Sequence, residues 1–175
     1  MCYTNNMRVR LLKGNITKLG VDAIVNTANN YLSGSAVKFD GPVHAAAGPE
    51  LAEACKKLGV CRVGEAKITD GYDLMADYVI HTVVPVWRGG VIGERNLLTS
   101  CYINCMELAL QHKVGAIAFP LLASASYGFP RLEALTIALT TLLQYEDDDI
   151  EISLVLGNSD THMQASRLLV QLTKK

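Results

Sequence analysis

Two short stretches of the sequence combine residue types that could hold an anionic ligand and act on it. The first, VNTANNYLSGSAVKFDG (25–41), follows an apolar run with three asparagines, several small residues and one carboxylate, Asp40. The second, FPLLASASYGFP (119–130), places small residues and an aromatic side chain just before Pro130, a residue suited to the start of a helix. The candidate ligand-binding residues of this second stretch are Ser124, Ala125, Ser126, Tyr127 and Gly128.

The chemistry that these stretches suggest is recognition of a nucleotide-like anion. Small residues let backbone N–H groups approach a phosphate closely, and the N-terminus of a helix adds a favourable electrostatic potential. An aromatic side chain beside them could cover a sugar or a base. The alternative is two ordinary turns, in which the small residues only permit a tight backbone geometry.

The asparagines of the first stretch raise a separate question, because a buried amide must be paired or it costs free energy. Asn26, Asn29 and Asn30 lie where the chain leaves a strongly apolar segment. Their amides can pair either with their own turn or with a bound ligand.

Short apolar runs, rich in valine and isoleucine and bounded by glycine, aspartate or asparagine, predict strands buried on both faces of a sheet. These runs cover residues 21–26, 78–84, 115–122 and 150–158. Residues 7–12 alternate at the period of a strand, and the more polar residues 64–71 indicate a weaker strand nearer an edge. Because both candidate stretches follow predicted strands, they lie where such sheets bind ligands, outside the carboxyl ends of the strands.

Amphipathic stretches between these runs predict helices over residues 48–59, 93–115, 130–145 and 160–175. In the first of them Pro49 suits the opening turn and Gly59 the stop, whereas the last has Asp160 or Ser159 as its expected N-cap. Strands that alternate with helices predict one α/β domain over residues 1–175, with the sheet inside and helices on both faces.

The composition excludes several classes of protein. Of the 175 residues, 50% are hydrophobic and 19% charged, which is typical of a soluble globular domain. No apolar run approaches the length that crosses a membrane, and the start, MCYTNNMRVRLLKG, lacks the apolar block of a secretion signal. A net charge of −1 argues against a general nucleic-acid binder, although backbone amides could still hold a small anion. We therefore expect a cytoplasmic protein.

The five cysteines favour reduced thiols in a cytoplasm, because their number is odd and no secretion signal precedes them. Cys101 and Cys105 lie four apart on a predicted helix, and together with His81 or His112 they could form a zinc site. Their spacing matches no compact metal pattern, such as a pair of CxxC motifs. Core packing is therefore the favoured interpretation, and nothing in the sequence requires a metal or a cofactor.

Five stretches of the chain match, in the same order, the sequence motifs of one family. They are GNITKLGVDAIVNTANN (14–30), DGPVHAAAGPEL (40–51), GEAKITDGYDLMADYVIHTV (64–83), ERNLLTSCYINCMELAL (94–110) and IAFPLLASASYGFP (117–130). Through them the chain resembles the macro domains, which bind ADP-ribose, and among these the MacroD-type hydrolases. The resemblance implies a three-layer α/β/α sandwich around a central mixed, mostly parallel sheet, with ADP-ribose in a cleft along the strand ends.

The resemblance also implies roles for residues of the first stretch and of the turn before it. Asn15 stands where the family's G-D-I-T turn has the aspartate that contacts the adenine amino group, and Ile16 follows it. Asn29 is the second asparagine of the family's N-A-A-N motif and is expected to hold the distal ribose. Asn26 and Asn30 are then expected to brace the turn.

For the second stretch the resemblance places the diphosphate against the backbone and Tyr127 beside the distal ribose. The residues expected there are Ala123, Ser124, Ala125, Ser126 and Tyr127. Asp40 matches the aspartate that, in MacroD-type enzymes, orients or activates a water near the anomeric carbon of that ribose; the alternative is a cap on the helix that follows. His44 is expected to pack within that helix, and His81 to be a hydrogen-bonded core histidine.

Two departures from the family pattern bear on function. The family's run of glycines before V-D-G is replaced by GSAVKFDG, so Lys38 and Phe39 could partly fill the distal-ribose pocket, or Lys38 could pair with the diphosphate. In ASASYG, Ala125 takes the place of a glycine that favours close approach of the ligand.

The function that the resemblance implies is binding of ADP-ribose and hydrolysis of mono-ADP-ribosyl esters on acidic side chains, or of O-acetyl-ADP-ribose. The expected partners are ADP-ribose and ADP-ribosylated protein. The alternative is a non-catalytic reader of ADP-ribose or of another nucleotide, and regulation of an RNA-processing enzyme is a third, weaker interpretation.

Overall fold

The computed structural model describes residues 8–33, 41–123 and 127–174 of the chain. Its strands are β1 (Val9–Lys13), β2 (Ala23–Thr27), β3 (Ala66–Asp70), β4 (Tyr78–Thr82), β5 (Ala116–Pro120) and β6 (Glu151–Leu156). Its α-helices are α1 (Gly41–Ala47), α2 (Pro49–Leu58), α3 (Glu94–Gln111), α4 (Arg131–Leu142) and α5 (Ser159–Thr173). Two 3₁₀ turns, η1 (Ile16–Lys18) and η2 (Leu143–Tyr145), complete the described elements.

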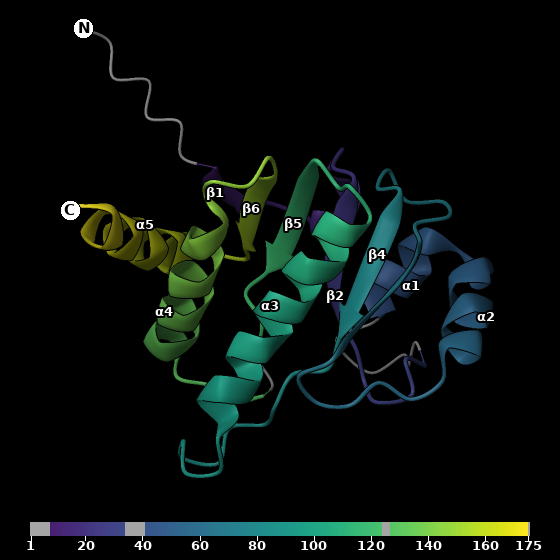
Figure 1. Ribbon diagram of the computed structural model, residues 1–175, viewed down its shortest axis with the longest axis horizontal. Helices are drawn as coiled ribbons and strands as arrows, with labels where there is room; N and C mark the ends of the chain where they lie inside the picture. Colours follow the sequence, from purple (N-terminus) through teal and green to yellow (C-terminus); the bar gives the residue numbers. More distant parts are fainter. Residues whose placement is uncertain (1–7, 34–40, 124–126, 175) are drawn as a thin grey trace, which may run out of the picture.

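The strands form one six-stranded sheet in the order β1-β6-β5-β2-β4-β3. β3 runs antiparallel to β4, and the other neighbouring pairs are parallel. Helices α3, α4 and α5 cover one face of the sheet, and α1 and α2 lie behind the other face (Figure 1). The predicted three-layer α/β/α sandwich with a mixed, mostly parallel sheet is confirmed.

Alternation along the central strands divides the core between the two faces. Ile24 and Val79 point to the side of α1 and α2, whereas Val25 and Ile80 point to the side of α3 and α4. This alternation explains the long apolar runs of the sequence, since a strand that is covered on both faces needs apolar residues at most positions.

The start of β2 is fixed relative to its neighbour by one carboxylate. Asp22 Oδ2 accepts hydrogen bonds from the backbone N–H groups of Gly115, at 2.7 Å, and Ala116, at 2.9 Å. The two strands then pair in parallel, with Ala23 opposite Ile117. Their carboxyl ends are therefore held at the same edge of the sheet.

The helix ends agree with the sequence prediction in one case and correct it in another. Pro49 opens α2 and Gly59, with φ of 69°, ends it. The N-cap of α5 is neither Ser159 nor Asp160 but Asn158, whose side chain accepts from the Thr161 N–H at 2.9 Å. The prediction was wrong because Ser159 and Asp160 are already in the helix, whereas Asn158 has the extended backbone that an N-cap needs.

Among the described residues, no helix has both the length and the apolar character that a membrane span requires.

Candidate functional site

The two candidate stretches leave the sheet side by side, because they follow β2 and β5, which are neighbours. Between them lies a small cavity of about 180 Å³ at the carboxyl ends of these strands. Its lining residues are Ile16, Val25, Asn26, Thr27, Pro42, Val43, Pro120, Leu121, Ala123 and Tyr127. Of the predicted ligand-binding residues, Ile16, Ala123 and Tyr127 are thus brought together from three separate parts of the chain.

Asn15 caps the 3₁₀ turn that carries Ile16 into this cavity. Its Oδ1 accepts hydrogen bonds from Thr17 twice, from the backbone N–H at 3.0 Å and from the hydroxyl at 2.9 Å. The carbonyl oxygen expected to face adenine therefore already has two donors from its own turn.

Asn29 shapes the turn that follows β2. Its Oδ1 accepts from the backbone N–H groups of Tyr31, at 3.0 Å, and Ser33, at 3.3 Å. Its Nδ2 donates to the carbonyl oxygen of Ser33 at 2.8 Å. The side chain predicted to hold a ribose therefore also organises the backbone of residues 29–33.

The other two asparagines pair with distant parts of the chain rather than with their own turn, which corrects the sequence prediction. Asn30 Nδ2 donates to the carbonyl oxygen of Cys61 at 3.0 Å, and the Cys61 N–H donates back to the Asn30 carbonyl oxygen at 2.8 Å. Asn26, buried in β2, lies 3.3 Å from Nδ1 of His81 in the neighbouring strand. The prediction failed because the sequence does not reveal which strand lies beside β2.

The second stretch has an unusual backbone where it borders the cavity. Ala123 has φ of 64°, a left-handed conformation that costs a residue with a Cβ of order 1–2 kcal/mol. Gly128, with φ of 76°, follows Tyr127. Strain of this kind is often retained where a backbone must present its amides to a ligand.

A loop before α3 supports this stretch, and nothing in the sequence pattern indicates that it does. The Trp87 N–H donates to the Tyr127 carbonyl oxygen at 2.7 Å, and the Trp87 ring lies 4.7 Å, centroid to centroid, from that of Phe129. The guanidinium carbon of Arg95 also lies over the Trp87 ring, 5.1 Å from the ring centroid. These contacts hold the end of the stretch against residues 87–95.

Glu94, the first residue of α3, is fully buried and fixes this loop. Oε1 accepts from the N–H groups of Arg88, at 2.8 Å, and Gly90, at 3.1 Å, and Oε2 accepts from that of Ile92 at 2.8 Å. Burial raises the pKa of Glu94, but the backbone hydrogen bonds outweigh it and lower the pKa overall. In the sequence this residue was indistinguishable from an ordinary acidic residue in the first turn of a helix.

Six predicted site residues lie outside the described residues. They are Lys38, Phe39, Asp40, Ser124, Ala125 and Ser126. The first residue of α1, Gly41, follows Asp40 directly in the chain, and Pro42 and Val43 line the cavity.

His81 is the hydrogen-bonded core histidine that the sequence predicted. It is fully buried, and besides Asn26 it has Thr69 Oγ1 at 3.0 Å from Nε2 and Cys55 Sγ at 3.7 Å from the same nitrogen. Burial, and to a smaller extent the nearby His44, lower the pKa of His81 to about 3. Burial also lowers the pKa of His44, which lies half-buried on α1.

Cys101 and Cys105 pack in the core of the sheet face covered by α3, as expected. Burial raises the pKa of the Cys101 thiol to about 11 and that of Cys105 well above its usual value. Cys101 Sγ donates to the Val83 carbonyl oxygen at 3.4 Å. Both thiols are therefore inert packing groups at neutral pH.

A larger groove, of about 810 Å³, lies away from this site along β3, between α2 and the end of α3. None of the residues predicted to bind ligand lines it. The smaller cavity is the better candidate because the predicted residues and the strained backbone meet there.

Comparison with known proteins identifies the family. The family model of the macro domain matches residues 25–138, from the middle of β2 through most of α4. The chain is a macro domain. Every residue that lines the cavity at the carboxyl ends of β2 and β5, except Ile16, therefore lies in the part of the chain that the family model covers.

This macro domain has close relatives in sequence and in structure. It is 49% identical over 152 residues to the macro domain-containing protein CT2219 of Chlorobaculum tepidum, covering 87% of this chain and 88% of that protein. It is 42% identical over 173 residues to the O-acetyl-ADP-ribose deacetylase of Citrobacter rodentium, covering 95% and 97%. A mutant of the Oceanobacillus iheyensis macrodomain with ADPR superposes with a TM-score of 0.87 at 35% identity, covering 94% and 93%.

Proposed function

We propose that this macro domain binds ADP-ribose in the cavity between the segments that follow β2 and β5, and hydrolyses esters of ADP-ribose there. The observation that supports this most is the convergence of Ile16, Ala123 and Tyr127 on one cavity at the carboxyl edge of the sheet. The similar Oceanobacillus structure contains ADPR, and the similar Citrobacter protein is an O-acetyl-ADP-ribose deacetylase.

The proposed pose follows from the positions of these residues. Adenine lies toward Asn15 and Ile16, the diphosphate lies against the backbone of residues 123–127, and the distal ribose lies toward Asn29 and Tyr127. The left-handed backbone of Ala123 orients the neighbouring N–H groups differently from an extended residue. This orientation suits an anion better than an apolar ligand.

The proposed reaction is attack by water on an ADP-ribosyl ester of an acidic side chain. The water oxygen forms a bond to the anomeric carbon of the distal ribose, and the bond from that carbon to the substrate's carboxylate oxygen breaks. Asp40 orients the water and accepts its proton, and the acidic side chain leaves as a carboxylate. A general base of this kind contributes about 10²–10⁴ in rate. O-acetyl-ADP-ribose is the second proposed substrate, and neither reaction requires a metal or other cofactor in this proposal.

The physiological partner that we propose is a mono-ADP-ribosylated protein in the cytoplasm. The nearly balanced charge of the chain, −1, favours this partner over nucleic acid. We also propose that residues 1–175 act as one macro domain.

A non-catalytic reader is the second candidate, and the sequence of two loops favours it. Lys38 and Phe39 replace part of the family's glycine run, and Ala125 replaces a further glycine. Side chains at these positions could allow ADP-ribose to bind and yet exclude the water that would attack the anomeric carbon.

Turnover of a protein carrying ADP-ribosyl-glutamate tests the proposal and separates the two candidates. Wild-type protein releases ADP-ribose from this substrate if it is an enzyme, and binds ADP-ribose without release if it is a reader. If it binds without turnover, replacing Ala125 by glycine and residues 35–39 by the family's shorter glycine run should create activity. A variant that stays inert with Asp40 intact would contradict the assigned role of Asp40.

A further inference from the structure

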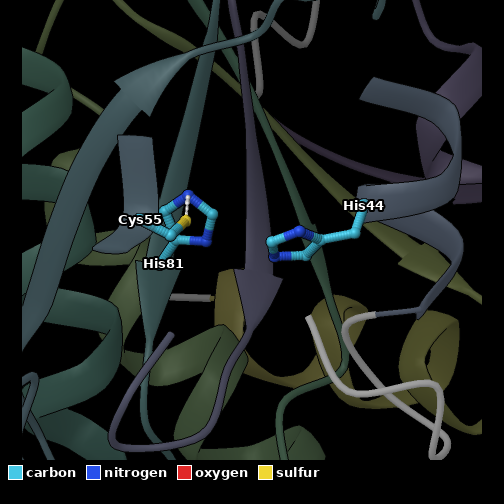
Figure 2. Close-up of side chains that lie close together, drawn as sticks. All are labelled: His44, Cys55 and His81. Atoms are coloured by element: carbon cyan, nitrogen blue, oxygen red, sulfur yellow. Dashed lines mark hydrogen bonds between the residues drawn. The ribbon is translucent and has the colours of Figure 1, made fainter. Parts of the chain in front are cut away.

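Three side chains with metal-binding atoms meet on the face of the sheet covered by α1 and α2. His44 comes from α1, Cys55 from α2 and His81 from β4, and one ligand atom from each lies within 4.8 Å of the others. In Figure 2 the imidazole of His44 points toward His81, and the sulfur of Cys55 lies against the His81 ring. The three residues are not close together in the sequence, so they form no recognisable metal-binding motif.

One ring nitrogen in this cluster lacks a hydrogen bond in the described part of the chain. His44 Nε2 is buried and has no hydrogen-bond partner among the residues that the structure describes. A buried nitrogen of this kind calls for an explanation, and an ion that it coordinates is one. The rings of His44 and His81 lie 6.3 Å apart between centroids, so the gap between them is at the scale of one bridging atom.

We propose that His44, Cys55 and His81 form a binding site for a Zn²⁺ ion that ties α1 to α2 and β4. Two imidazoles and one thiolate are a donor set that suits zinc, which is borderline-soft and accepts both nitrogen and sulfur. A fourth position is left for an oxygen ligand, either water or the hydroxyl of Thr69, which lies 3.0 Å from His81 Nε2.

The separations are close to those of a tetrahedral zinc site. With bonds of 2.0–2.3 Å, ligand atoms around zinc lie about 3.3–3.6 Å apart. Cys55 Sγ and His81 Nε2 are already 3.7 Å apart. Every separation in the cluster is within 4.8 Å, so binding requires the ligand atoms to move together by about 1 Å.

The protons of the site can be accounted for. Cys55 releases its thiol proton to solvent on binding, and the two imidazoles bind as neutral ligands. For His81 to bind through Nε2, its ring proton must be on Nδ1, which faces Asn26 at 3.3 Å. Rotation of the Asn26 amide then places Oδ1 there as the acceptor, so that Asn26 fixes the tautomer as residues behind a metal ligand commonly do.

A groove lies beside the cluster on one side. Thr69 and Ala54 are among the residues that line the groove of about 810 Å³ beside β3. Because the Thr69 hydroxyl also contacts His81, movement of this one side chain would connect the groove to the cluster.

The site also has a structural consequence for the first candidate stretch. His44 lies in the first turn and a half of α1, and Asp40 immediately precedes that helix. An ion held by His44, Cys55 and His81 would fix α1, whose first residue follows Asp40 in the chain, against the sheet. The inference itself does not depend on ADP-ribose binding.

The test is titration of the reduced, full-length chain with Co²⁺, which replaces Zn²⁺ and gives a thiolate-to-metal charge-transfer band. We expect one Co²⁺ per chain, the band, and its loss on addition of one equivalent of Zn²⁺. Cys55→Ser should abolish the band, whereas the control Cys101→Ser, at a buried cysteine of the other core, should retain it. Absence of the band in wild type, or its persistence in Cys55→Ser, would overturn the proposal.

A second variant covers the case in which Cys55→Ser does not fold. His44 is only half-buried, so His44→Gln should fold and lose Co²⁺ affinity by at least about tenfold. Zn²⁺ should raise the Tm of wild type by more than that of His44→Gln. An equal rise in both proteins would place the metal elsewhere and would also overturn the proposal.

Discussion

The backbone N–H of Trp87 donates to the carbonyl oxygen of Tyr127 at 2.7 Å, and this bond couples the loop before α3 to the stretch that follows β5. The loop is in turn organised by the buried carboxylate of Glu94, which accepts three backbone N–H groups. One wall of the candidate cleft therefore depends on a side chain that does not line it.

The first prediction concerns Glu94→Gln and pH. The substitution replaces one acceptor oxygen by an N–H₂ group that faces a backbone N–H, so the protein should be less stable than wild type at neutral pH. The folded-state pKa of Glu94 lies below its usual 4.5, so the carboxylate stabilises the fold above that value, and this contribution is lost as the pH falls through the folded-state pKa.

Urea unfolding across this range measures the difference between the two proteins. The gap in the free energy of unfolding should be largest at neutral pH and should narrow below pH 4.5. ADP-ribose affinity of the variant should also fall, because the support of Tyr127 is loosened. A gap that is independent of pH would contradict the assigned role of the carboxylate.

The second prediction concerns adenine recognition by Asn15. Its Oδ1 is engaged by Thr17, so Asn15→Asp keeps the cap with one oxygen and offers the other to the adenine amino group. Charge-assisted hydrogen bonds are roughly twice as strong as neutral ones, and ADP-ribose should bind tighter by about 1 kcal/mol. Calorimetry measures this, and Asn15→Ala is the control that loses both cap and contact. Unchanged affinity in Asn15→Asp would show that adenine lies elsewhere.

The third prediction separates the two roles of Asn29. Asn29→Ala removes the acceptor of the Tyr31 and Ser33 N–H groups and should cost about 1 kcal/mol of stability as well as affinity. Asn29→Asp keeps these acceptors but loses the Nδ2 donor to Ser33. If both variants bind ADP-ribose like wild type in the folded state, the asparagine serves the turn alone.

The fourth prediction concerns Asp40. Asp40→Ala should abolish hydrolysis of ADP-ribosyl-glutamate while ADP-ribose affinity stays within about tenfold, or 1.4 kcal/mol, of wild type. Because this carboxylate could also cap α1, at a cost of about 1 kcal/mol, thermal unfolding must be measured beside the kinetics. Residual turnover near the wild-type rate would remove Asp40 from the chemistry.

The fold could be predicted from the sequence because its determinants are local. Strands such as β2 and β4 are buried on both faces, which gives continuous apolar runs, and α2 has a proline and a glycine at its two ends. The cap of α5 was misplaced by one or two residues because Asn158, Ser159 and Asp160 are all good caps, and only the backbone conformation separates them.

The environment of the site was less predictable because it depends on contacts between distant residues. The sequence does not show that Asn26 lies beside His81, or that Glu94 accepts hydrogen bonds from the loop before it. Both contacts follow from how the strands and α3 pack. The cluster of His44, Cys55 and His81 has no spacing motif for the same reason. What the sequence did provide was the pair of strand ends at which Ile16, Ala123 and Tyr127 converge.

Calorimetric titration of the wild-type chain with ADP-ribose tests the central claim most directly. The account predicts one binding site per chain, with affinity weakened by Asn29→Ala and by a substitution in the cavity wall such as Val43→Trp. Absence of binding at millimolar ADP-ribose, or binding that Val43→Trp leaves unchanged, would contradict the claim that this ligand occupies the cavity at the ends of β2 and β5.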